Sequence, residues 1–238
     1  SVEMLAPRAQ KLPMLGLGGS IGTPPEGITA PILVVKTFDE LKERAAEARG
    51  RIVLFNTPFT EYRETVKIRY QGADEASRAG AVASLIRSVG PFSMQTPHTG
   101  GMRYADSTRK IPHAAISIED AQMLQRMQDR GVTPRLRIKM EAKTLPDALS
   151  RNVVAEIPGT EHPEQVVIIS GHIDSWDVGT GAMDDGGGCL AAWEAARLML
   201  KLELKPRRTI RIVLWTNEEN GMRGAKTYRD THAATLKN

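Results

Sequence analysis

The 238-residue sequence predicts an α/β protein, and three observations support this fold class. Short β-branched runs alternate with amphipathic segments, as they do in sheets flanked by helices. The composition, 41% hydrophobic and 25% charged, is typical of a globular protein. A second block of more continuous hydrophobic strands begins at Asn152. We therefore expect two α/β blocks, the first of which covers roughly residues 23–146.

The first block alternates strands with helices. Residues 32–36 and 51–55 predict strands, and between them Thr37 begins a capping-box pattern that predicts a helix stopped by Gly50. We then expect an alanine-rich helix at about 73–88, a strand at 111–118, a helix at 119–130 and a strand at 136–140. The loops at 57–72 and 91–110 are longer than most connections.

The second block predicts a sheet covered on both faces. Strands are expected at residues 152–158, 166–170 and 209–215, with a hairpin-like connection at 159–165. Helical spacing of apolar residues predicts a helix entered through the glycines at 186–188, on which lie Leu190, Trp193, Ala196, Leu200 and Leu204. Residues 224–238 predict a last helix.

Charge and isolated motifs exclude several classes of function. The net charge of the chain is only +4, and its basic residues are scattered along the sequence instead of forming a concentrated basic stripe. We therefore expect neither a nucleic-acid nor a membrane partner. Ser20 lies in a formal match to a hydrolase nucleophile elbow, but Pro24 and Pro25 prevent the helix that such an elbow requires. The single cysteine, Cys189, cannot form an internal disulfide. Histidines without ligand spacing are interpreted as structural or surface residues: His98, His113, His162 and His232.

Two acid-rich clusters follow predicted strands. The stretch GHIDSWDVGTGAMDDGGG, residues 171–188, places His172 and Asp174 at the end of one strand and Asp184 soon after it. Glu218 and Glu219 follow the next strand. Clustered carboxylates repel one another unless a cation neutralises them or one of them is protonated, and imidazole with carboxylates suits zinc, manganese or cobalt. An acidic surface loop and a helix-start carboxylate pair remain as alternatives.

The stretches GHIDSWDVGTGAMDDGGG and WTNEENGMRGA resemble the co-catalytic zinc aminopeptidases and glutamate carboxypeptidases. The resemblance extends over essentially the whole chain, including LPMLGLGGSIGTPPEGITAP and LIRSVGPFSMQTPHTG. It implies that residues 23–146 form a protease-associated domain inserted into the catalytic domain. Residues 1–22 would be the catalytic-domain segment that leads into the insert, and residues 147–238 the first part of the zinc-peptidase mixed sheet with its flanking helices.

The same resemblance assigns a role to each residue of the site. His172 would bind one zinc ion, Asp184 would bridge two zinc ions, and Glu219 would bind the other. Glu218 would be the general base, and Asp174 would orient the imidazole of His172. A cis peptide bond is implied after Asp184, whereas Asp177 and Asp185 receive no metal role.

The function implied is that of a dizinc metallocarboxypeptidase or dipeptidase acting on short peptides through a metal-activated water. The family also needs an aspartate and a histidine after the paired glutamates, and Asp230 and His232 lie too close to Glu219 to match them. We therefore expect an incomplete fragment with weak metal binding and little activity. The resemblance further implies a secreted or lysosomal protein, with no signal peptide in this chain, and is compatible with a homodimer.

Two other functions are compatible with the sequence. One is a non-catalytic binding module built mainly from the protease-associated domain, which metal content and dipeptide hydrolysis would distinguish from a peptidase. The other is acyl transfer of the glutaminyl cyclase type, which usually needs one zinc ion. The paired Glu218 and Glu219 count against this last function.

Overall fold

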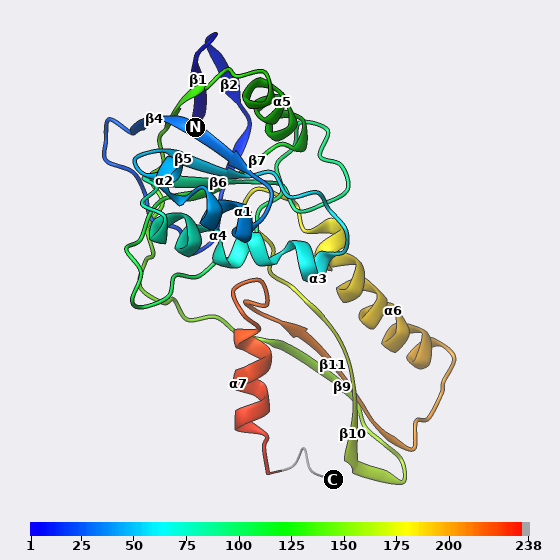
Figure 1. Cartoon of the computed structure of the whole chain (residues 1–238). Coiled ribbons are helices and arrows are strands. Elements are labelled where there is room, and N and C mark those ends of the chain that lie inside the picture. Colours follow the sequence, from blue (N-terminus) through cyan, green and yellow to red (C-terminus); the bar gives the residue numbers. More distant parts are fainter. Residues whose placement is uncertain (235–238) are drawn as a thin grey trace. The chain divides into compact units, whose positions relative to one another are not determined.

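The computed structural model describes residues 1–234 and has a mixed α/β fold. The chain divides into two compact units, Ser1–Pro146 and Asp147–Asn238, which are described separately (Figure 1). The end of the predicted last helix, residues 235–238, lies outside the described residues. Within the described part, no helix combines the length and hydrophobicity that a membrane crossing requires.

The first unit is built on a sheet of eight strands in the order β2-β1-β8-β4-β5-β6-β7-β3. Strands β4 to β7 are parallel, and the flanking pairs are antiparallel. The strands are β1 (Val2–Ala6), β2 (Gln10–Leu12), β3 (Met14–Gly16), β4 (Ile28–Val35), β5 (Ile52–Phe55), β6 (Ala83–Arg87), β7 (His113–Ile116) and β8 (Arg135–Ile138). The helices are α1 (Phe38–Glu43), α2 (Ala45–Ala48), α3 (Tyr62–Thr65), α4 (Lys67–Arg78) and α5 (Ile118–Asp129).

Both faces of this sheet are covered. On one face, Leu54 and Leu85 belong to the same buried cluster as Leu124 of α5. On the other face, Val53 clusters with Leu41 of α1 and with residues of α4. Burial on both faces explains why the central strands are continuous hydrophobic runs rather than alternating ones.

The predicted helix at 73–88 is wrong in its second half. Helix α4 begins earlier, at Lys67, and ends at Arg78, and the chain turns at Gly80 with φ of +83°. Residues 83–87 then form β6, which pairs with β5 and β7 and is buried throughout. A short apolar run is compatible with a buried helix or a buried strand, and here the two neighbouring strands decide. The predicted loop at 57–72 accordingly contains α3 and the start of α4.

Residues 1–22 lie in the first unit together with the residues that follow them. Strand β1 pairs with β2 and β8, and β3 pairs with β7. Val2, Met4 and Leu12 are part of the buried cluster that includes α5. Sheet pairing and shared burial therefore join this segment to the residues that follow it.

The second unit contains a three-stranded sheet in the order β10-β11-β9. Strands β10 (His162–His172) and β11 (Arg208–Trp215) are parallel, and β9 (Val153–Ile157) is antiparallel to β11. Because β11 lies between β9 and β10, the connection at 159–165 is not the expected hairpin between neighbouring strands. Helix α6 (Gly187–Lys201) follows a turn at Ala182–Gly186, in which Asp184 and Asp185 have non-helical backbone angles, and α7 (Arg223–Thr231) follows β11.

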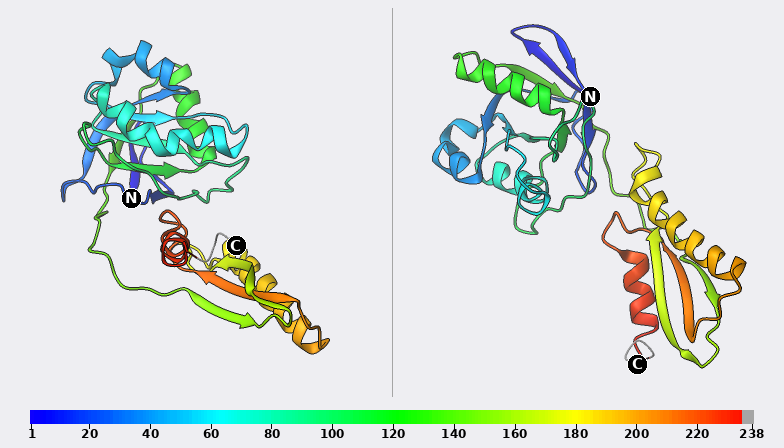
Figure 2. Two further views of the ribbon diagram at one scale, coloured as in Figure 1. Left: turned by 90° about the horizontal axis from the view of Figure 1, so that it is seen from below. Right: turned by 90° about the vertical axis from the view of Figure 1, so that its right-hand side faces the viewer.

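Helices α6 and α7 cover opposite faces of this sheet (Figure 2). On one face, Ile212 and Leu214 of β11 cluster with Ala192 of α6. On the other face, Arg211 of β11 donates a hydrogen bond to the hydroxyl of Tyr228 in α7. The alternation of side chains along β11 thus assigns each helix to its face.

Candidate metal centre

The candidate site lies where two parallel strands end side by side. Strand β10 ends at His172, which pairs in register with Trp215 at the end of β11. The backbone N–H of Ile173 continues this pairing by donating to Trp215 O at 2.7 Å. The segments that follow the two strands therefore run next to each other, and they carry Asp174 on one side and Glu218 and Glu219 on the other. Ligands of open α/β sheets bind at this edge.

Three of the residues singled out in the sequence come together here. One ligand atom each from His172, Asp184 and Glu219 lie within 4.8 Å of one another. His172 Nε2 is 2.9 Å from Asp184 Oδ1 and 3.9 Å from the Oε2 atom of Glu218. An imidazole nitrogen with two carboxylate oxygens is a donor set that suits zinc.

The imidazole of His172 is oriented by a backbone carbonyl. Its Nδ1 lies 2.9 Å from the carbonyl oxygen of Asp174. Because a carbonyl only accepts, Nδ1–H donates to Asp174 O. In the metal-free chain Nε2 also needs a proton to contact the Asp184 carboxylate, which is an acceptor 2.9 Å away. Nε2 is therefore the ring nitrogen that a metal ion would bind, in place of the proton that faces Asp184.

The Asp174 carboxylate accepts hydrogen bonds from the backbone of the paired glutamates and none from the imidazole ring. Its Oδ1 accepts from the N–H of Glu218 at 2.9 Å and its Oδ2 accepts from the N–H of Glu219 at 3.2 Å, whereas Oδ1 is 3.7 Å from His172 Nδ1. We expected Asp174 to orient the imidazole. In the structure its backbone carbonyl contacts the ring, and its carboxylate fixes the turn that carries Glu218 and Glu219.

Asp185, for which the sequence suggested no metal role, holds the backbone on both sides of the site through its carboxylate. Its carboxylate accepts from the backbone N–H groups of His172 and Gly188, both at 3.0 Å, and so joins the end of β10 to the start of α6. In the sequence, Asp185 lies three residues before Gly188, near the start of the predicted helix, and this is the spacing of an aspartate that caps a helix. The peptide bond between Asp184 and Asp185 is cis, as the resemblance implied.

Gly171, near the end of β10, allows this strand to lie close to the start of helix α6. A Cβ atom added at Gly171 would lie 2.5 Å from Cys189 N and 2.7 Å from the carbonyl carbon of Gly188. These are backbone atoms of α6, which cannot rotate away as a flexible side chain does. Only glycine therefore fits at the end of β10 next to His172.

Trp176 is a second residue that sequence reasoning missed. Its indole Nε1–H donates a hydrogen bond to Glu219 Oε2 at 2.9 Å. Asp177, its neighbour, is exposed and lies outside the three-residue group. Spacing along the chain gave no signal for the Trp176 contact, since the two residues are 43 positions apart.

The electrostatics of the site reflect crowded carboxylates. Desolvation is the largest influence on the pKa of Glu219 and raises it, and the charge of Asp184 raises it further. For His172, desolvation is the largest single influence and opposes protonation, but contacts with Asp174 O, Asp184 and Glu218 together raise its pKa. Both shifts follow from an excess of negative charge in a partly buried place, which a bound cation would relieve.

The remaining candidates have other surroundings. Ser20 Oγ accepts from the N–H of His113 at 2.9 Å, and Ser84 Oγ lies 2.6 Å from His113 Nδ1, so both serines hold a buried histidine in the first unit. Burial lowers the pKa of His113 to about 4. His162 lies 3.9 Å from Glu164 in an exposed pair. These contacts agree with the interpretation of His113 and His162 as structural or surface residues.

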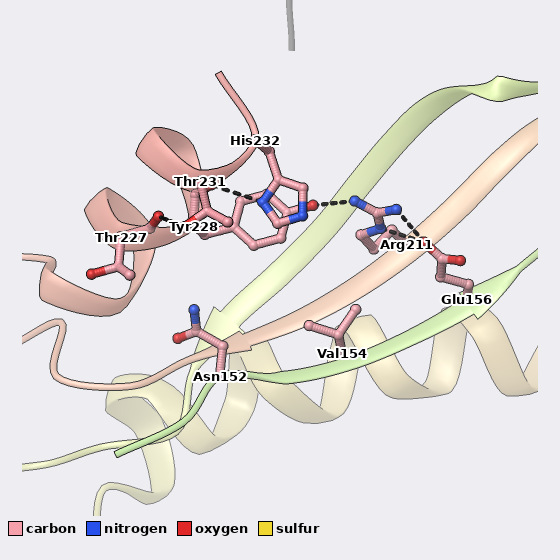
Figure 3. A pocket seen from close by; sticks show the side chains of 8 residues that line it. All are labelled: Asn152, Val154, Glu156, Arg211, Thr227, Tyr228, Thr231 and His232. Atoms are coloured by element: carbon pink, nitrogen blue, oxygen red, sulfur yellow. Dashed lines mark hydrogen bonds and ion pairs between the residues drawn. The ribbon is translucent and has the colours of Figure 1, made fainter. Parts of the chain in front are cut away.

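A pocket beneath α7 is separate from the acidic cluster (Figure 3). It is lined by Asn152, Val154, Glu156, Arg211, Thr227, Tyr228, Thr231 and His232, none of which belongs to the predicted site. His232 stacks on Tyr228 with ring centroids 4.1 Å apart, and its Nδ1 lies 2.9 Å from Tyr228 O. Its contacts therefore bind it to its own helix, on the face of the sheet that α7 covers.

The chain is similar in sequence to known peptidases. Residues 152–238 match the model of peptidase family M28. The resemblance inferred from the sequence is confirmed: the whole chain is 56% identical over 238 residues to carboxypeptidase Q of Homo sapiens and covers 50% of that relative. The chain thus spans about half the length of the curated relatives it matches.

Solved structures show the same fold. A peptidase M28 precursor from Shewanella amazonensis superimposes with a TM-score of 0.92 at 37% identity, over 99% of this chain and 55% of that one. A zinc aminopeptidase from Bacillus subtilis superimposes with a TM-score of 0.66 at 23% identity, over 97% of this chain and 52% of that one. The second likeness bears on the fold alone.

Proposed function

We propose that this chain is part of a zinc exopeptidase that hydrolyses short peptides and uses two zinc ions. The observation that carries the proposal is the convergence of His172, Asp184 and Glu219 within 4.8 Å at the ends of two parallel strands. The identity to carboxypeptidase Q over the whole chain supports a peptidase of this kind.

The residues of the candidate site would have two different roles, metal binding and proton transfer. His172, Asp184 and Glu219 would hold the metal, with Asp184 shared between the two ions. Bound zinc supplies a water of lowered pKa and polarises the scissile carbonyl. Glu218, whose Oε2 lies 3.9 Å from His172 Nε2, would take a proton from the attacking water and pass it to the leaving amine.

Further features are proposed from the resemblance. The first unit would contain the inserted protease-associated domain, and the protein would be secreted or reside in a lysosome. Its partners would be small peptides and, in the assembled enzyme, a second copy of the chain. Because the described residues provide a group of three donors for two ions, we expect the 238-residue chain to bind zinc weakly and to hydrolyse dipeptides slowly.

Zinc titration of paired variants tests the proposal. Glu219→Gln should weaken zinc binding by more than the tenfold to hundredfold that loss of a residue supporting a ligand costs. Glu218→Gln should leave zinc affinity close to that of the parent chain. In the full-length protein, Glu218→Gln should abolish dipeptide hydrolysis with zinc content near normal.

Other outcomes would change the assignment. If Glu218→Gln lost zinc and Glu219→Gln did not, the roles of base and ligand would be exchanged. If neither variant differed from a parent chain that itself failed to bind zinc, the non-catalytic binding module would be the better function.

A further inference from the structure

Trp176 contacts the proposed ligand Glu219 directly. Its Nε1–H donates to Glu219 Oε2 at 2.9 Å, from the segment that follows β10 to the segment that follows β11. The indole is partly buried, as is Glu219. The contact therefore joins two side chains that are held in a restricted space.

The chemistry of the indole suits a support for a metal-binding carboxylate. An indole N–H is a donor only, so Trp176 cannot itself bind the metal. It is also neutral, so it holds one oxygen of Glu219 without cancelling the negative charge that attracts a cation. A lysine or arginine in this place would neutralise the carboxylate and repel the metal.

The segments that follow β10 and β11 contact each other at several positions. Some of these contacts restrict the backbone and one restricts a side chain. Ile173 N–H bonds Trp215 O, and the carboxylate of Asp174 bonds the N–H groups of Glu218 and Glu219. Those contacts hold the backbone of the paired glutamates. The bond from Trp176 is the one that restricts the Glu219 carboxylate itself.

We propose that Trp176 is a positioning residue, which holds Glu219 Oε2 through its indole N–H and leaves the other carboxylate oxygen for the metal ion. The inference rests on the proposed function, because it gives Glu219 the role of a ligand. It adds a residue that acts through Glu219 and touches neither the metal nor the reacting atoms.

Trp176→Phe tests the inference in the 238-residue chain, because it removes the N–H and keeps an aromatic ring. We expect zinc affinity, measured by competition with a chromogenic chelator, to fall about tenfold to a hundredfold. Trp193→Phe is the matched control, since Trp193 lies on α6 with 63% of its surface exposed, and it should leave zinc affinity unchanged. A benzothienylalanine at position 176 retains the shape of the indole and should lose affinity as Trp176→Phe does.

A spectroscopic measurement separates positioning from general support of the fold. On titration with zinc, the Nε1–H resonance of Trp176 should shift, because its acceptor carboxylate becomes a ligand, whereas that of Trp193 should not. The inference is overturned if the Trp176 resonance stays in place or if benzothienylalanine binds zinc as the parent chain does. If Glu219→Gln also leaves zinc affinity unchanged, the proposed function fails as well; if it lowers affinity, only the role of Trp176 is rejected.

Discussion

Replacing Asp174 with asparagine should weaken zinc binding about tenfold to a hundredfold without removing the proton from His172 Nδ1. The carboxylate accepts two backbone N–H groups, from Glu218 at 2.9 Å and from Glu219 at 3.2 Å. Asparagine keeps one acceptor oxygen, but its NH₂ group cannot accept the second N–H. One hydrogen bond to a charged acceptor is therefore lost.

The magnitude follows from that single bond. Hydrogen bonds to charged groups contribute about 1.5–3 kcal/mol, and each 1.4 kcal/mol is a factor of about ten in affinity. Asp174 is only 22% exposed in its side chain, so water does not readily replace the lost partner. The imidazole keeps its orientation because its Nδ1–H donates to the backbone carbonyl of Asp174, which the substitution leaves in place.

The assay combines zinc affinity with nuclear magnetic resonance of the metal-free chain. The amide resonances of Glu218 and Glu219 should move in Asp174→Asn, and the ¹⁵N shifts of His172 should keep the pattern of an Nδ1-protonated ring. Asp177→Asn is the control, since Asp177 is an exposed carboxylate in the same loop. The reasoning is refuted if His172 Nδ1 loses its proton while both glutamate amides stay in place.

Two further predictions concern the close approach at β10 and the buried histidine of the first unit. Gly171→Ala should cost about 1–3 kcal/mol in stability and weaken zinc binding, because its Cβ would lie 2.5 Å from Cys189 N, whereas Gly179→Ala, which meets nothing within 4 Å, should do neither. His113 has a folded pKa of about 4 against 6.5 in the unfolded chain, so its neutral form is favoured by folding. Its contribution of about 3 kcal/mol is complete above pH 6.5 and is lost as the pH falls toward 4. Hydrogen exchange of β6 and β7 amides should show this loss, and His113→Gln should remove it; an equal loss in the variant would exclude His113 as its cause.

Much of the candidate site was predictable from the sequence because it depends on local patterns. The β-branched runs at 166–170 and 209–215 form parts of β10 and β11 as expected. Polar residues that follow two hydrophobic strands meet when the strands are parallel neighbours, and this brought His172 and Asp184 near Glu219. The helix start at Thr37 was also predictable, since the Thr37 hydroxyl accepts the N–H of Glu40, three residues ahead.

Other features depended on contacts that no local pattern contains. The apolar run at 83–87 became a strand because β5 and β7 provide partners on both sides. Segment 1–22 joined the first unit because β1 pairs with β8, more than a hundred positions away along the chain.

The sequence by itself determined which residue types gather at the ends of β10 and β11, because strand propensity and hydrophobic burial are local properties. Only the tertiary structure decided which atom of each residue faces which partner. The register of His172 opposite Trp215 brings the carboxylate of Asp174 to the amides of Glu218 and Glu219, and the indole of Trp176 to the Glu219 side chain. A shift of one residue would turn each side chain to the other face of the sheet, so these contacts depend on the packing that selects the register.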